Sequence, residues 1–270
     1  MNVRIGNQTA FAAKSSLEPF EFALEQGFEV FEFFPDRGPA GTAGWDERGM
    51  SLDEREYIRR AAELCGLALT VHAPLAFDPL REPSDVRFNS TVELARDIGA
   101  GLVNLHLDMS QGAEVFGRAL LPALQATRQA GLQLALENTV WTGPEAFNTF
   151  FDWLRAHEPR LVRHVGMCFD LGHANLCAAT LNDYCGFLDQ LNADIPIIHL
   201  HLHENFGDRD SHLPLFTGPS RNNPAGILGL LERLQRRAFD GCAILEQWPH
   251  PPGLLVEARD RLQMLLNTLR

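Results

Sequence analysis

The sequence predicts an α/β protein folded as a single (β/α)8 barrel. Short apolar runs alternate with longer amphipathic stretches along the chain, a pattern typical of repeated βα units. Eight runs of each kind in 270 residues match the usual size of such a barrel. A doubly wound open sheet is the alternative, but its usual GxGxxG or GxxxxGK[ST] phosphate turn does not occur in the sequence.

The predicted strands are short runs rich in Val, Ile and Leu. Their starts are separated by roughly 25 to 50 residues, which is the length of one βα unit. In chain order they cover residues 3–5, 28–34, 67–71, 102–107, 132–136, 165–169, 195–202 and 242–245.

The predicted helices lie between these strands and have recognisable ends. Ser51 and Glu54 have the spacing of a capping box, and that helix stops at Gly66. Thr142 and Glu145 suggest a second capping box, with a proline in the first turn. The other predicted helices cover residues 16–26, 84–98, 113–130, 179–191, 224–237 and 255–269.

The chain shows no linker and no low-complexity segment, so residues 1–270 are expected to form one domain. The Gly/Pro-rich stretch 35–49 is expected to be a long loop after the second strand. In a barrel, loops on that side border the active site.

The composition excludes several classes of function. The net charge of −12 argues against a broad basic surface for nucleic acid or membrane. Lys14 is the one lysine, and its surroundings fit neither a Schiff-base nor a P-loop lysine.

The five cysteines are odd in number, form no CxxC pair and lie mostly among apolar neighbours, so we expect reduced core residues. With no signal peptide and no 18-residue apolar run, a cytoplasmic location is expected.

Ionisable side chains follow most of the predicted strands at their carboxyl ends. In a barrel these ends converge on one mouth. Imidazole and carboxylate groups are ligands suited to zinc and manganese, and a cation would relieve the repulsion among carboxylates. A histidine at one strand end is usually structural, but six strand ends share this feature here, which predicts a metal centre. The candidates are His72, His106, Glu137, Asp170, His173, His201, Glu246 and, in a loop, Asp210 and His212.

The predicted seventh strand carries three alternating histidines. His199, His201 and His203 share one face because side chains in a strand repeat every second residue. His201 is the favoured ligand. His199 would lie deeper in the barrel, and His203 beyond the strand end.

The ordered set from His72 to Glu246 resembles the xylose-isomerase-like TIM-barrel superfamily. This superfamily includes sugar and sugar-phosphate isomerases and epimerases, and the endonuclease IV enzymes of AP endonuclease family 2. The resemblance covers the second to the eighth strand. It is specific for the superfamily and poorly specific for the reaction.

The epimerase branch implies one divalent ion held by Glu137, Asp170, His201 and Glu246. By this resemblance the ion would bind two sugar oxygens and polarise a carbonyl. Glu137 and Glu246 would exchange a proton with the substrate carbon, and His173 would orient the substrate. Glu32, at the end of the second strand, and Asn138, beside Glu137, are the expected substrate contacts, although a solvated strand-edge role is equally open for Glu32.

The endonuclease IV branch implies three zinc ions, and all nine of its ligands have counterparts in this chain. Three features count against it: the negative charge, the segment Leu-Pro-Leu-Phe-Thr-Gly after His212, where Gly-Glu-Gly is usual, and a loop after His72 that lacks the expected Tyr and Asn. The nine counterparts are His72, His106, Glu137, Asp170, His173, His201, Asp210, His212 and Glu246.

We therefore expect a metal-dependent isomerase or epimerase that acts on a small sugar, sugar phosphate or polyol. A trinuclear zinc phosphodiesterase is the alternative, and a metal-free binding protein on a decayed barrel is the third hypothesis. The expected cofactor is a divalent ion, zinc or manganese first, with magnesium or cobalt also fitting. The expected partner is a small carbohydrate, with nucleic acid only under the alternative. No membrane partner is expected, and a homo-oligomer stays open.

Overall fold

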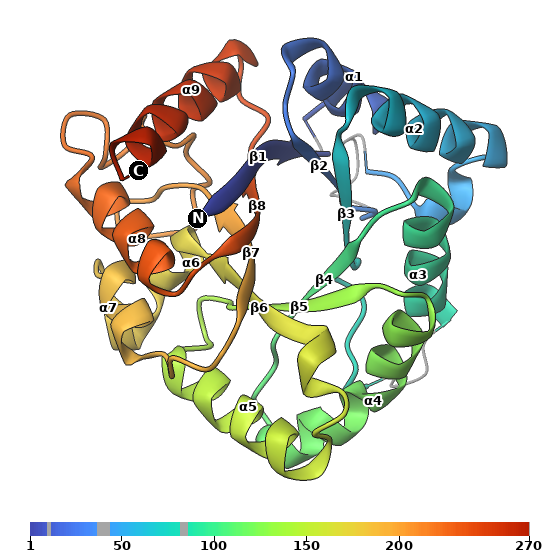
Figure 1. The fold of residues 1–270 in the computed structure, drawn as a ribbon, viewed down its shortest axis with the longest axis vertical. Coiled ribbons are helices and arrows are strands. Elements are labelled where there is room, and N and C mark those ends of the chain that lie inside the picture. Colours follow the sequence, from blue (N-terminus) through green and yellow to red (C-terminus); the bar gives the residue numbers. More distant parts are fainter. Residues whose placement is uncertain (10–11, 37–43, 82–85, 270) are drawn as a thin grey trace.

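Eight parallel strands close into a barrel. The computed structural model describes residues 1–9, 12–36, 44–81 and 86–269, and in it β1 to β8 pair in chain order, with β8 pairing back to β1 (Figure 1). The predicted (β/α)8 barrel is confirmed, and the open sheet is excluded. The strands are β1 (Asn2–Gln8), β2 (Val30–Phe33), β3 (Ala68–His72), β4 (Leu102–His106), β5 (Gln133–Glu137), β6 (Val165–Asp170), β7 (Ile197–Leu202) and β8 (Asp240–Leu245).

Helices surround the barrel and cover the outer face of its strands (Figure 1). Phe31 and Phe33 of β2, for example, pack against Phe20 of the first helix with ring centroids 5.5 Å apart in both pairs. Burial of such aromatic rings contributes to the stability of this layer. The helices are α1 (Leu17–Gln26), α2 (Leu52–Cys65), α3 (Val86–Ile98), α4 (Ala113–Gln129), α5 (Pro144–His157), α6 (Leu171–Leu176), α7 (Tyr184–Gln190), α8 (Ala225–Arg236) and α9 (Gly253–Thr268).

The inner face of the barrel changes character along each strand. Inward-facing residues recur at every second position. In β2 the inward pair is Val30 then Glu32, and in β5 it is Ala135 then Glu137. Apolar side chains thus fill the amino-terminal end of the barrel, and ionisable side chains gather at the carboxyl end.

Of the two predicted capping boxes, the structure contains one and lacks the other. The Ser51–Glu54 capping box is present: the Ser51 hydroxyl accepts from the Glu54 amide, and the Glu54 carboxylate accepts from the Ser51 amide. The second capping box is wrong, because the Thr142 hydroxyl accepts from the Thr139 amide at 2.7 Å and Gly143 takes the cap position of α5. The predicted start at residue 84 lies outside the described residues.

The segment after β6 also differs from the prediction. The expected helix 179–191 begins only at Tyr184, because Asn182 has a left-handed φ of 61° and Asp183 caps α7. The short helix α6 was not predicted. It begins directly after β6, where the Asp170 carboxylate accepts from the His173 amide at 2.6 Å.

The cysteines are all free, but not all lie in the core. Cys168, Cys177 and Cys242 are buried as expected, whereas Cys65, at the end of α2, is exposed and Cys185 is half-buried. Among the described helices, none combines the length and apolar character that a membrane span requires.

Candidate metal centre

The predicted ligands converge at the carboxyl end of the barrel. Strand register sets much of this arrangement: His106 of β4 is paired with Glu137 of β5, and Asp170 of β6 is paired with His201 of β7. Residues far apart in sequence therefore become neighbours because the strands that carry them lie side by side.

Glu137 lies at the middle of the cluster, and its carboxylate is surrounded by imidazoles. Its Oε2 lies 3.1 Å from Nε2 of His72 and 3.2 Å from Nδ1 of His201. Its Oε1 lies 3.5 Å from both Nε2 of His106 and Nδ1 of His173. The side chain is fully buried, so this carboxylate is kept apart from solvent.

Three carboxylates and one imidazole form the oxygen-rich part of the cluster, which we call the carboxylate centre: Glu137, Asp170, His201 and Glu246. The Nδ1 atom of His201 lies 3.9 Å from Asp170 Oδ2 and 3.5 Å from Glu246 Oε2, in addition to its contact with Glu137. Asp170, His201 and Glu246 offer ligand atoms within 4.8 Å of one another. These four residues are the set that the resemblance to the epimerase branch implied for a single ion.

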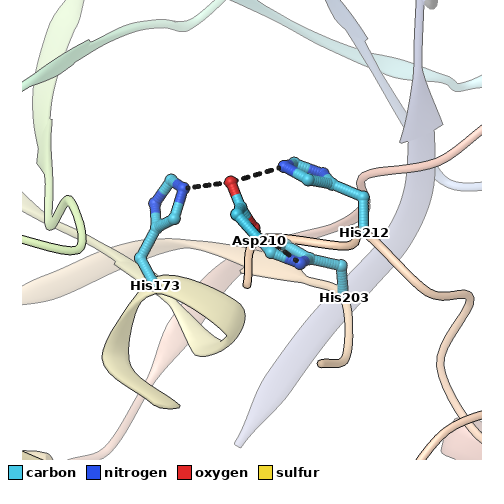
Figure 2. Close-up of side chains that lie close together, drawn as sticks. All are labelled: His173, His203, Asp210 and His212. Atoms are coloured by element: carbon cyan, nitrogen blue, oxygen red, sulfur yellow. Dashed lines mark hydrogen bonds and ion pairs between the residues drawn. The ribbon is translucent and has the colours of Figure 1, made fainter. Parts of the chain in front are cut away.

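A second group lies beside the carboxylate centre and is richer in nitrogen (Figure 2). Asp210 Oδ2 lies 3.3 Å from Nε2 of His173 and 3.1 Å from Nε2 of His212. His203 also belongs to this group, with Nδ1 3.8 Å from Asp210 Oδ1. The ligand set expected from the sequence omits His203, which it puts beyond the strand end. The alternation His201-Leu-His203 was the signal that could have found it, because alternate residues share a face.

Neighbouring imidazoles keep the carboxylates of Glu137, Asp170 and Asp210 ionised in the metal-free protein, because they lower the pKa of each. Burial by itself would raise the pKa of Glu137, but the nearby His201 and His106 hold that pKa well below its ordinary value. Burial would likewise lower the pKa of His212, but its hydrogen bond with Asp210 and neighbouring negative charges raise it to about 9. Glu137 and His212 are thus stabilised in their charged forms by neighbours of opposite charge.

Several buried atoms in the cluster have no hydrogen-bond partner. They are Oε1 of Glu137, Oε2 of Glu246, Nδ1 of His201 and Nδ1 of His203. Buried polar atoms are normally satisfied, and leaving one unsatisfied costs about 1–3 kcal/mol. Glu137, Glu246 and His201 belong to the carboxylate centre, and Nδ1 of His201 lies 3.5 Å from Oε2 of Glu246, so a divalent ion with imidazole and carboxylate ligands fits these residues.

Glu32 and Asn138 are the expected substrate contacts, but in the structure each bonds one of the predicted ligand residues. The Glu32 carboxylate accepts hydrogen bonds from Nε2 of His201 and Nε2 of His199, both at 2.8 Å. The Asn138 side chain bonds the backbone of Asp170 in both directions, at 2.8 and 2.9 Å. Both side chains are 0% exposed, so the structure gives them supporting positions rather than places on a cavity wall.

A cavity of about 590 Å³ opens above the cluster. Its floor includes His72, His106 and Glu246, and its walls include aromatic side chains, among them Trp45 and Trp248. Trp45 lies in the predicted loop 35–49, whose residues 37–43 are outside the described part. A cavity of this size, with polar groups converging on one side, is typical of a small-molecule site.

Comparison with known proteins shows where this fold occurs. A crystal structure of a D-tagatose 3-epimerase-like protein has a TM-score of 0.74 at 20% identity, covering 98% of this chain and 97% of that one. Endonuclease IV from Thermus thermophilus has a TM-score of 0.64 at 24% identity, covering 98% and 99%. At these identities the likeness shows the fold alone.

Sequence comparison adds the family. An uncharacterized protein of Methanocaldococcus jannaschii, MJ1311, is 34% identical over 85 residues, which are 31% of this chain and only 26% of that relative. The family model described as xylose isomerase-like TIM barrel matches residues 20–266, nearly the whole chain. The chain therefore belongs to the xylose isomerase-like TIM-barrel family.

Proposed function

We propose that this protein is a metal-dependent isomerase or epimerase acting on a small sugar, sugar phosphate or polyol. One observation carries the proposal. Glu137 and Glu246 both approach Nδ1 of His201, at 3.2 and 3.5 Å, so two carboxylates lie beside one ligand atom. Glu246 also lines the cavity, where a substrate would reach it.

The carboxylate centre would hold the ion through Glu137, Asp170, His201 and Glu246. Three carboxylates and one imidazole suit manganese, magnesium, cobalt or zinc. When bound, the ion supplies Lewis acidity that polarises a substrate carbonyl.

The chain's own carboxylates would move the proton. One of Glu137 and Glu246 removes the proton from the carbon next to the carbonyl, and the electron pair of that C–H bond forms an enediolate. For epimerisation, the other carboxylic acid returns a proton to the same carbon from the opposite face. For isomerisation, it protonates the neighbouring carbon, while the hydroxyl proton on the first carbon moves to the oxygen of the former carbonyl. The lowered pKa of Glu137 in the metal-free protein keeps this carboxylate ionised.

The cavity walls support a carbohydrate substrate. Phe34, Trp45 and Trp248 contribute aromatic rings to the wall. Such rings can pack against the apolar face of a sugar while the metal centre binds its hydroxyl groups. The D-tagatose 3-epimerase-like structure and the structure of L-ribulose 3-epimerase, with a TM-score of 0.70 at 17% identity, add support by analogy.

The test is exchange of a substrate proton with solvent. Protein loaded with manganese is incubated in D₂O with a panel of ketohexoses and ketopentoses, and deuterium incorporation is followed by NMR. We expect incorporation at the carbon next to the carbonyl for at least one sugar, and its loss in Glu246→Gln. No incorporation into any sugar at high enzyme concentration would contradict the proposal.

A trinuclear zinc phosphodiesterase is the second candidate, and a specific observation favours it. The nine residues that resemble the endonuclease IV ligands all lie in the cluster or its adjacent group. The endonuclease IV structure matches over nearly all of both chains. Cleavage of a duplex containing an abasic site by zinc-loaded protein would support this candidate, whereas an intact duplex would remove it.

A further inference from the structure

We propose that a second cavity beside the metal centre binds one sugar unit of a glycosylated ketose, while the ketose unit itself lies at the carboxylate centre. We call this second cavity the outer subsite. The inference rests on the proposed function and deepens it, because it names the substrate class. That class is an uncharged disaccharide with a free ketose carbonyl, rather than a single sugar or a sugar phosphate.

The outer subsite is a cavity of about 550 Å³ between the loops that follow β3, β4 and β5. It adjoins the cavity above the metal cluster, because Leu75 and His106 line both. Each volume lies in the range of about 300–1,000 Å³ that is usual for small-molecule sites, so each can hold a sugar ring. The remaining wall of the outer subsite includes Asp78, Asp108, Thr139 and Trp141.

Trp141 gives the outer subsite an aromatic surface. This residue is 89% exposed, although tryptophan is usually among the more buried residues. The turn that carries it is fixed, because the Thr139 hydroxyl accepts from the Trp141 amide at 3.2 Å and the Thr142 hydroxyl accepts from the Thr139 amide at 2.7 Å. An exposed indole on a fixed turn at the edge of a cavity can pack against the apolar face of a sugar ring.

Asp108 supplies a hydrogen-bond acceptor in the same cavity. Its Oδ1 accepts from the Ser110 amide at 2.8 Å, which fixes the carboxylate of this half-buried residue. None of the residues that the structure describes bonds the second oxygen, Oδ2. A sugar hydroxyl can therefore donate to Oδ2, in a charge-assisted hydrogen bond that is stronger than one between neutral groups. Asp78, by contrast, has both oxygens occupied, by the Leu80 amide at 2.9 Å and the Arg81 guanidinium at 3.1 Å.

The charges of both cavities favour an uncharged ligand. Among the described residues, neither cavity is lined by a lysine or an arginine, whereas Asp78 and Asp108 line the outer subsite. Phosphate groups are commonly bound by arginine and lysine. A phosphorylated sugar would find no such cation on the described walls, and a DNA backbone would meet two carboxylates. Sugar hydroxyls, which can donate to Asp108, fit the outer subsite better.

The position of the outer subsite shows how a second sugar unit can aid the reaction. His106 borders both cavities, and its Nε2 lies 3.5 Å from Oε1 of Glu137 in the metal cluster. A disaccharide that contacts Trp141 and Asp108 therefore extends past His106 toward the proposed proton-transfer groups. Binding energy from a part of the substrate that does not react can position the part that does.

Binding measurements give the test, and they do not depend on turnover. Calorimetry on the manganese-loaded protein compares D-fructose with three uncharged disaccharides that contain it, namely maltulose, isomaltulose and lactulose. We expect at least one disaccharide to bind about tenfold more tightly than D-fructose, a gain that one ring contact and one charge-assisted hydrogen bond can supply. D-fructose 6-phosphate should show no such gain.

Two variants locate the gain. Trp141→Ala and Asp108→Asn should each lose most of the difference between the disaccharide and D-fructose, while circular dichroism and metal content show a folded, loaded barrel. Phe206→Ala and Asp53→Asn are the matched controls and should keep the full difference, because both residues are exposed and line neither cavity. In the wild type, the disaccharide should also protect tryptophan fluorescence from acrylamide more than D-fructose does, which provides a test without any variant.

Four outcomes would overturn the inference. They are equal binding of D-fructose and every disaccharide, tighter binding of D-fructose 6-phosphate than of any disaccharide, an undiminished difference in the two folded variants, and no binding of any sugar. Proton exchange on free ketoses together with the first outcome would leave the proposed function intact. Tight disaccharide binding without proton exchange would support the outer subsite and contradict the proposed reaction.

Discussion

The Glu32 carboxylate fixes the imidazole of His201. Its Oε1 atom accepts a 2.8 Å hydrogen bond from Nε2 of His201. The other carboxylate oxygen accepts from His199 at 2.8 Å and from the Thr70 hydroxyl at 2.9 Å. Because Nε2 donates to Glu32, Nδ1 is the atom of His201 that faces the carboxylate centre and becomes the ligand atom once the ring loses its extra proton. Burial alone would raise the pKa of Glu32, but the two imidazoles hold it below its ordinary value.

Replacement of Glu32 should weaken metal binding without removing a ligand. In Glu32→Gln, the amide cannot accept from both histidines, so the ring of His201 loses its fixed tautomer. We expect the affinity of the carboxylate centre for manganese to fall about 10- to 100-fold, as measured by calorimetry. Glu25→Gln, an exposed change on α1, is the control. Unchanged affinity in Glu32→Gln would show that Glu32 does not support His201.

The two carboxylates of the proposed proton transfer should be indispensable for turnover. Glu137→Gln and Glu246→Gln each remove a proton acceptor at nearly constant side-chain volume. We expect each to lower the rate of proton exchange by at least about 10²- to 10⁴-fold, the usual contribution of a general acid or base. Circular dichroism should show a folded barrel in both. Activity retained in both variants would contradict the site assignment.

Metal binding should compete with protons. The pKa of His212 is about 9 in the metal-free protein, and that of His201 is also raised, because their acidic neighbours outweigh the effect of burial. At neutral pH these imidazoles are therefore protonated, and they must lose the proton to become ligands. We expect metal binding to release protons and to strengthen as pH rises toward 9, which calorimetry in buffers of different ionisation enthalpy would detect. Proton uptake on binding would contradict this.

The capping box of α2 gives a stability test far from the metal centre. Ser51→Ala removes the hydroxyl that accepts from the Glu54 amide. We expect a loss of about 1 kcal/mol in the free energy of unfolding, measured with urea. Metal content should not change, which separates this effect from that of the site variants. Thr142→Ala should not act through helix capping, because Thr142 bonds Thr139 instead.

The positions of most ligands could be predicted because they depend on local patterns. His72, His106 and Glu137 each end a strand, and in a parallel barrel the strand ends meet at one mouth. The helix over 179–191 failed because turn geometry at Asn182 interrupts it. The start of α6 was missed because the Asp170 side chain, read as a ligand, also caps that helix.

Local sequence patterns were enough to specify the barrel and the chemical character of its mouth, because hydrophobic periodicity and strand-end residues are properties of short segments. The roles of Glu32 and His203 emerged only from the folded chain. Glu32 of β2 meets His201 of β7 across the barrel, and His203 fits beside Gly172 of α6. Such contacts depend on strand register, tilt and packing between distant segments, which no local pattern records.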